Sequence, residues 1–307
     1  MRIYIDQNIL SVQAKSAVTL SLPGHEVVYS TIHFDEIRRS INVEPYLCAL
    51  KRLKARLLEP VMRNGLPEDH VQIVDAPPKQ LFEIYLQKRA NYPIDTAQFS
   101  EILAWLSGGG SEESVASAPA KIHDFFIDSL SAHEAQLPKD LSRILADSLM
   151  KSVNSVVSKA RAHGNDYRAD WKRLGAEKNG FSNLFGKNQL LQIWDTVKDR
   201  VPDRSPEAFF GFEWKKNGNN VPAPQILGIV ACCGVLDALG FQAEKKRRKV
   251  KNQANVQSDA QHIAMASFCD VLFTQDERLY RRAKAIYEFR RMQVNAIYLD
   301  QTGEPHL

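Results

Sequence analysis

Short apolar runs alternate with longer amphipathic segments at both ends of this chain. The first half predicts strands at residues 2–5, 26–29 and 71–74, and the last part predicts strands at 270–274 and 294–299. Pro23-Gly24 gives a turn before the second of these strands. Alternation of such strands with helices is typical of a mostly parallel sheet covered by helices.

The segments between the strands predict helices. In chain order we expect them from residue 9 onward, at 34–42, at 46–64, after Pro77-Pro78 as far as 89, at 259–268 and at 277–290. The third of these would be long and basic and would end at Gly65. Together the strands and helices predict an α/β sandwich.

The middle of the chain differs from both ends in composition and in hydrophobic pattern. Residues 106–120 contain three consecutive glycines and several serines, which is typical of a linker, and residues 122–162 have helical periodicity. Residues 166–220 are aromatic and basic. We therefore expect one α/β domain formed by residues 1–92 and 222–307, interrupted by a mainly α-helical insertion at 93–221.

Composition adds little except through charge. The 307 residues are 44% hydrophobic and 25% charged, which is ordinary for a globular protein. No stretch reaches the roughly 20 apolar residues of a membrane helix, so we expect no membrane association and a cytoplasmic location. The four cysteines, Cys48, Cys232, Cys233 and Cys269, form no CxxC pair, and we expect reduced core thiols.

The net charge of +4 is unevenly distributed. Six cations lie within seven residues, namely Lys245, Lys246, Arg247, Arg248, Lys249 and Lys251. Such a cluster suits a polyanionic partner, and we expect it to contact backbone phosphates near the active site. A solvated loop, or a nuclear import signal, is the alternative interpretation of the same run.

Acidic residues stand where the predicted strands end. Asp6 directly follows the first strand, and Asp276 lies two residues beyond the strand that ends at Thr274. Glu36 and Asp259 are each expected in the first turn of a helix, Asp259 with Ser258 as its N-cap. Because ligands of open α/β sheets bind at the carboxyl ends of the strands, we expect the four acids to converge there.

Four converging carboxylates would repel one another unless cations lay among them. Oxygen ligands of this kind select Mg²⁺ or Mn²⁺. Two such metals suffice for phosphodiester hydrolysis by an activated water. The sequence offers no convincing Ser-His-Asp or Cys-His arrangement as an alternative.

Three stretches carrying these acids resemble the PIN-domain nucleases. Residues 3–10 (IYIDQNIL) are similar to the first strand and aspartate of that family, and residues 28–37 (VYSTIHFDEI) are similar to its second strand and helical acid. Residues 258–266 (SDAQHIAMA), followed by 269–276 (CDVLFTQD), resemble its third acid and the strand ending in Thr-x-Asp. The resemblance implies a PIN-like α/β/α sandwich whose acidic pocket binds Mg²⁺ or Mn²⁺ and usually cuts RNA.

Other polar residues near the acids have weaker claims. Asn8 and Thr274 are candidates to hydrogen-bond the carboxylates, and His262 lies one helical turn after Asp259. Local capping and structural packing are the competing roles. Asp35, adjacent to Glu36, is the competing acid on its helix, and Asp270 is expected to be a turn residue.

The sequence therefore predicts a metal-dependent endoribonuclease, with Asp6, Glu36, Asp259 and Asp276 as catalytic metal ligands. The resemblance points to a prokaryotic toxin or defence nuclease controlled by an inhibitory or activating protein partner. A DNA-directed nuclease, a catalytically silent nucleic-acid-binding protein and, less favoured, a phosphatase are the alternatives. The sequence leaves open whether the chain is a homo-oligomer.

Overall fold

A computed structural model describes residues 1–16, 22–63, 66–91, 147, 151, 154, 155, 158, 181, 184–216, 218–243, 250–300, 305 and 306. The chain forms two compact units. The first contains Met1–Lys88, Asn179–Ala243 and Gln257–Leu307, and the second contains Arg89–Lys178 and Glu244–Val256. Residues 179–221 of the expected insertion thus group with the first unit, whereas the expected linker at 106–120 lies outside the described residues.

The first unit is built on a seven-stranded sheet with strand order β4-β3-β2-β1-β7-β8-β9. The strands are β1 (Arg2–Ile5), β2 (Glu26–Ser30), β3 (Arg56–Arg63), β4 (Leu66–Val74), β7 (Val271–Thr274), β8 (Asn295–Leu299) and β9 (Pro305–His306). The five strands from β3 to β8 in this order pair in parallel, and the two edge strands β4 and β9 are antiparallel. The α/β class and the mostly parallel sheet are therefore confirmed.

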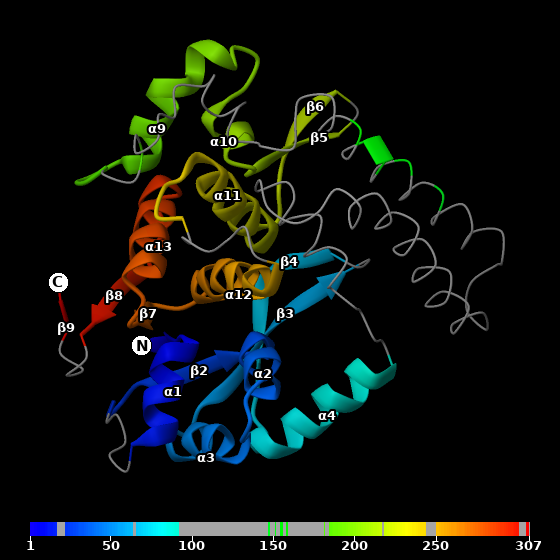
Figure 1. Cartoon of the computed structure of the whole chain (residues 1–307), viewed down its shortest axis with the longest axis vertical. Helices are drawn as coiled ribbons and strands as arrows, with labels where there is room; N and C mark the ends of the chain where they lie inside the picture. The colour runs from blue at the N-terminus through cyan, green and yellow to red at the C-terminus, as the bar shows by residue number, and fades with distance from the viewer. Residues whose placement is uncertain are drawn as a thin grey trace. The chain divides into compact units, whose positions relative to one another are not determined.

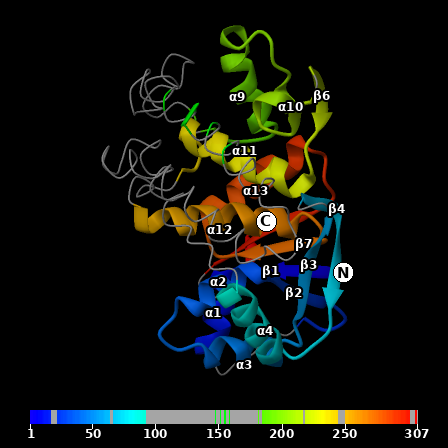
Figure 2. The ribbon, with the colours of Figure 1, turned by 90° about the vertical axis from the view of Figure 1, so that its right-hand side faces the viewer.

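Helices cover both faces of this sheet, which gives three layers (Figures 1 and 2). On one face lie α1 (Gln7–Lys15), α3 (Glu44–Arg52) and α4 (Pro78–Asn91). On the other lie α11 (Gln225–Leu239), the part of α12 (Val250–Ala266) that belongs to this unit, and α13 (Glu277–Phe289). The helix α2 (Thr31–Arg38) follows β2 directly.

The central strand β1 shows how the sheet serves both layers. Ile3 and Ile5 belong to the same buried cluster as Leu10 of α1 and Leu50 of α3. Tyr4, between them, points to the opposite face and hydrogen-bonds a side chain of α12. Because successive strand residues alternate between faces, one apolar strand supplies the core on one side and a polar anchor on the other.

The prediction of a long helix at residues 46–64 is wrong. The helix α3 ends at Arg52, Lys54 takes a left-handed backbone conformation with φ of 49°, and β3 begins at Arg56. Pro60 would remove a hydrogen bond from a helix and clash with the preceding turn. In β3 it lies where the pairing with β4 shifts register, which a proline tolerates.

Residues 184–243 add a small cap to the first unit. It comprises α9 (Gln189–Val197), the 3₁₀ turn η1 (Lys198–Arg200), α10 (Pro206–Phe209), α11 and the hairpin of β5 (Glu213–Lys216) and β6 (Asn219–Pro222). The rings of Phe210 and Phe212 pack against Phe289 of α13, with centroids 5.4 Å and 5.8 Å away. These aromatic side chains thus form core contacts.

Three of the four cysteines are buried, as predicted, and all four are free thiols. Cys48 is exposed, so its assignment to the core is wrong. It lies on the outer side of α3, whose neighbouring Leu47, Ala49 and Leu50 provide the buried side. Among the described helices, none is long and apolar enough to span a membrane.

A buried ion pair joins α11 to α13. The guanidinium of Arg282 donates to the carboxylate of Asp237, and the residues are only 3% and 8% exposed. The Nε of Arg282 has no hydrogen-bond partner among the described residues. Removing the cation would leave a buried carboxylate uncompensated, and such losses are strongly destabilising.

We expect Arg282→Met to lower the free energy of unfolding by about 3–5 kcal/mol, measured by chemical denaturation. The double variant Asp237→Leu with Arg282→Met should recover most of that loss, because no charge is left unpaired. Arg281→Met is the matched control: Arg281 is adjacent to Arg282 but pairs with Glu277 on the surface, so the cost should stay below about 1 kcal/mol. Equal costs for the two arginines would contradict this interpretation.

Candidate functional site

The order in which the chain adds strands to the sheet reverses between β1 and β7. From β1 the chain continues to β2 and β3 on one side, and from β7 it continues to β8 on the other, so adjacent β1 and β7 form a topological switch point. Asp6 follows β1, and Asp276 lies two residues beyond β7. Ligands of open α/β sheets bind in the crevice at such a point.

Asp6 is held on both carboxylate oxygens and is 1% exposed. Its Oδ1 accepts the backbone N–H of Ile9 at 2.9 Å, which caps α1. Its Oδ2 accepts the hydroxyl of Thr274 at 2.5 Å and the amide of Asn8 at 3.4 Å. Asn8 and Thr274, the two residues predicted to hydrogen-bond the carboxylates, therefore both donate to Asp6. Asp6 also caps α1.

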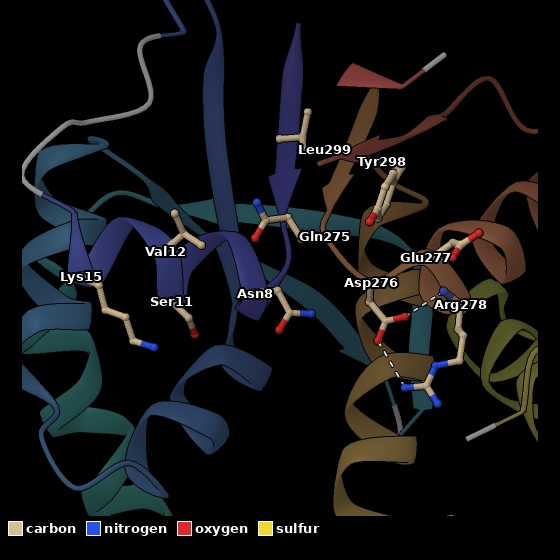
Figure 3. A pocket seen from close by; sticks show the side chains of 10 residues that line it. All are labelled: Asn8, Ser11, Val12, Lys15, Gln275, Asp276, Glu277, Arg278, Tyr298 and Leu299. Atoms are coloured by element: carbon tan, nitrogen blue, oxygen red, sulfur yellow. Dashed lines mark hydrogen bonds and ion pairs between the residues drawn. The ribbon is translucent and has the colours of Figure 1, made fainter. Parts of the chain in front are cut away.

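Asp276 caps α13 from the other side of the switch point. Its Oδ1 accepts the backbone N–H groups of Arg278 and Leu279 at 2.8 Å and 3.1 Å, and its Oδ2 lies 3.5 Å from the Arg278 guanidinium (Figure 3). The backbone N–H of Asp276 itself donates to the hydroxyl of Thr274 at 2.9 Å. Thr274 thus connects the two acids through a single oxygen.

Glu36, and not Asp35, faces the site. The Oε2 of Glu36 lies 3.3 Å from Nε2 of His262 on α12. Asp35 instead accepts the hydroxyl of Tyr85 on α4. Consecutive residues of a helix point about 100° apart, so only one of the two acids can face α12.

Asp259 does not lie at a helix start. The helix α12 begins at Val250, so Asp259 lies within it and Ser258 is not its N-cap. The run of residues 250–257 has little apolar periodicity, which hid the helix from a pattern-based prediction. Asp259 and His262 are three residues apart on this helix and therefore lie on one face.

The charges of the acids shift one another's pKa values. Burial, together with the charge of Asp276, raises the pKa of Asp6 to about 6. Burial and the charges of Asp276 and Glu36 raise the pKa of Asp259 to about 7, against the opposing effects of His262 and Arg282. Charge effects therefore link the four predicted acids beside the carboxyl edge of the sheet, and Asp276 acts on two of the others.

Glu36 behaves differently because it has a cationic partner. Burial raises its pKa, but His262, with smaller contributions from His33 and Ser258, outweighs burial and lowers it. Burial likewise lowers the pKa of His262, and Glu36, Asp6 and Asp259 reverse the shift and raise it. The two shifts agree in sign with an imidazolium–carboxylate pair inside the site.

A buried chain of hydrogen bonds holds the ring of His262 through its Nδ1, the nitrogen that does not face Glu36. Its Nδ1 lies 2.8 Å from the hydroxyl of Tyr4, which lies 2.7 Å from the hydroxyl of Ser30. His33 packs against His262 with ring centroids 4.7 Å apart. Sequence patterns did not single out Tyr4 or Ser30, because neither has a motif of its own.

The state of His33 follows from its partners. Its Nδ1 accepts the backbone N–H of Ser30 at 3.1 Å, so its Nε2 carries the proton and donates to the carbonyl of Ile5 at 2.9 Å. Burial and the neighbouring His262 lower the pKa of His33 to about 3. His33 is therefore a neutral structural residue that completes the capping box of α2.

The donor set fits a hard divalent cation in its chemistry, since buried carboxylates with raised pKa values gain from a neighbouring positive charge. As the side chains stand, no three His, Cys, Asp or Glu residues in the described part of the chain are grouped closely enough to hold one ion. Asp6 and Asp276 are instead engaged as helix caps, and Glu36 is paired with His262. Asp6, Asp259 and Asp276 are the acids that a cation would draw together.

The predicted phosphate-binding run can be placed only in part. Lys245, Lys246, Arg247, Arg248 and Lys249 lie outside the described residues. Lys251 lies in α12, the same helix as Asp259, which begins nine residues before the helix predicted at 259–268. Asp270 lies at the opposite end of β7 from Asp276, where its carboxylate accepts the backbone N–H of Arg2 at 2.6 Å.

Comparisons of the chain with models of protein families, with curated proteins and with solved structures find no match. The interpretation of the site therefore rests on its residues alone.

The raised pKa values of Asp6 and Asp259 predict a specific pH dependence of stability. Both carboxyls bind protons more tightly in the folded protein than in the unfolded chain, so their contribution to stability is present below about pH 4 and is lost as pH rises through about 6 and 7. In the absence of divalent cations, Asp259→Asn should therefore increase the free energy of unfolding at about pH 8 by an amount on the order of 2 kcal/mol, which raises the melting temperature by a few degrees. Near pH 4 the variant and the wild type should have the same melting temperature.

The exposed Asp75 supplies the control. Asp75→Asn should leave the melting temperature unchanged at both pH values, measured by calorimetry in a chelating buffer. A lower melting temperature of Asp259→Asn than of the wild type at about pH 8 would contradict the mutual repulsion of these acids.

Proposed function

We propose that this chain is a Mg²⁺- or Mn²⁺-dependent endoribonuclease with a PIN-like fold. The observation that carries the proposal is that Asp6, Glu36, Asp259 and Asp276 lie near enough to the switch point of a mostly parallel sheet for their charges to act on one another, with two of them at raised pKa values. Asp6 and Asp276 also cap helices, but the repulsion among these carboxylates costs the fold stability. Perturbed acids that converge in a crevice are typical of functional sites.

The order of the parallel strands supports the PIN-like assignment. Acids follow β1 and β7, a third stands on α2 after β2, and a fourth comes from the helix α12 before β7. This is the order in which the family resemblance places its acids. The larger size of the chain lies in residues outside that arrangement.

Within the proposed site each acid has a distinct setting. Thr274 and Asn8 orient Asp6 through hydrogen bonds to its Oδ2. His262 pairs with Glu36 and keeps it ionised. Asp6, Asp259 and Asp276 would hold the cation, which when bound supplies neutralisation of the phosphate charge and activation of the attacking water.

RNA is the favoured substrate on the family resemblance alone, since carboxylates and a divalent cation are indifferent to the sugar. A DNA-directed nuclease is the second candidate, and a catalytically silent nucleic-acid-binding protein is the third. The raised pKa values argue against the silent binder, because binding a polyanion does not require a cluster of buried acids. A toxin or defence role, a regulatory protein partner and the cytoplasmic location remain predictions from sequence.

The test is cleavage of matched single-stranded RNA, structured RNA and single-stranded DNA by the purified full chain, with and without Mn²⁺. We expect cleavage of RNA that requires the cation. Asp6→Asn and Asp259→Asn should each reduce the cleavage rate by more than about 100-fold. This exceeds the loss expected from removing a residue that only hydrogen-bonds a metal ligand. Thermal melts should show that both variants remain folded.

Glu36→Gln and Asp35→Asn form a matched pair of adjacent substitutions. The first should impair cleavage and the second should not, because Asp35 faces Tyr85. Faster cleavage of DNA than of RNA would favour the second candidate. Absence of cleavage on every substrate, with nucleic-acid binding unaffected by Asp6→Asn, would sink the nuclease proposal in favour of the binder.

A further inference from the structure

A hollow of about 570 Å³ opens beside the acids at the switch point. One wall is the α1 face that carries Asn8, Ser11, Val12 and Lys15, and the opposite wall is formed by residues 275–278 with Tyr298 and Leu299 of β8 (Figure 3). Asn8 and Asp276, which lie at its inner end, also belong to the acidic site. The hollow is therefore continuous with the proposed cleavage site.

Three of the four side chains on the α1 wall are polar. Asn8, Ser11 and Lys15 recur at intervals of three and four residues, so they lie on one face of the helix. In Figure 3 their polar ends point to the same side as Asp276 and Arg278. Seven residues of helix separate Asn8 from Lys15, a distance of roughly 10 Å.

The cation at the outer end is available to a ligand. Lys15 is exposed, and no ion pair joins it to a carboxylate among the described residues. Glu277, on the opposite wall, is engaged by Arg281 at 2.5 Å. A purely structural role is the alternative, in which Lys15 stabilises the C-terminal end of α1 through the helix dipole.

Apolar surface accompanies the polar track. Val12 lines the hollow and is 43% exposed. The half-buried ring of Tyr298 and the buried Leu299 face it from β8. A ligand with a charged backbone on one side and a flat apolar group on the other matches such a recess.

We propose that this hollow holds the nucleotide next to the cleaved bond, with its phosphate on Lys15 and Ser11 and its base against Val12 and Tyr298. This inference rests on the proposed function and adds to it a substrate-binding site on α1. Because Lys15 lies roughly 10 Å along the helix from Asn8, it contacts a neighbouring phosphate and not the one that is cut. The site therefore binds substrate before and after cleavage alike.

Two variants test the site. Lys15→Glu removes the cation, and Val12→Glu places a negative charge in the hollow without disturbing the buried core. Lys79→Glu, at an exposed position on α4, is the control with the same change in net charge as Lys15→Glu. Melting temperatures close to that of the wild type show that all three variants are folded.

Binding is measured by fluorescence anisotropy with a short labelled single-stranded RNA, in an Asp6→Asn background that prevents cleavage. Lys15→Glu and Val12→Glu should weaken binding about 10-fold, and Lys79→Glu should not. Between about 50 and 200 mM salt, the slope of log affinity against log salt should fall by about 0.7 in Lys15→Glu. With Asp6 intact, KM should rise by a similar factor while kcat stays close to that of the wild type.

The outcomes separate this inference from the proposed function. Equal binding and KM in Lys15→Glu and Lys79→Glu, with cleavage still dependent on Asp6, would overturn the nucleotide site and keep the nuclease. Weakened binding in Lys15→Glu without cleavage by the wild type would keep the strand-binding site and overturn the nuclease. Failure of the wild type to bind RNA at all would overturn both.

Discussion

The hydroxyl of Thr274 is the contact on which the arrangement of the site depends. It donates to Asp6 at 2.5 Å and accepts the backbone N–H of Asp276 at 2.9 Å. One threonine oxygen thus links the carboxylate of Asp6 to the backbone of Asp276, although the two acids lie 270 positions apart in the sequence. Because Thr274 is fully buried, water does not compete for these hydrogen bonds.

Around this contact, positive and neutral groups limit the repulsion among the acids. His262 pairs with Glu36, and Arg282 lies close enough to Asp259 to oppose the increase in its pKa. Each cation is anchored on its far side, His262 by Tyr4 and Arg282 by Asp237. These two cations, which the surrounding structure fixes in place, offset only part of the repulsion, since the pKa values of Asp6 and Asp259 stay raised.

Sequence patterns predicted the parts of this arrangement that depend on local order. The strands ending at Ile5 and Thr274 were short, apolar and followed by acids, so Asp6 and Asp276 could be placed at one sheet edge. Asp259 could be chosen only as a residue, because the polar start of α12 has no apolar face to reveal a helix. The strand β3 was missed because its leucines also suit a helix, although Pro60 was a signal against one.

The central pair of the sheet joins residues 3–5 to residues 271–273, nearly the whole chain apart in sequence. During synthesis β1 emerges first and must wait for β7 before it can pair on that side. A nascent or truncated chain that lacks the last strands can bury part of the apolar core, but it contains neither Thr274 nor Asp276. The acidic pocket thus cannot form until the segment that carries Thr274 and Asp276 has been synthesised and has paired with β1.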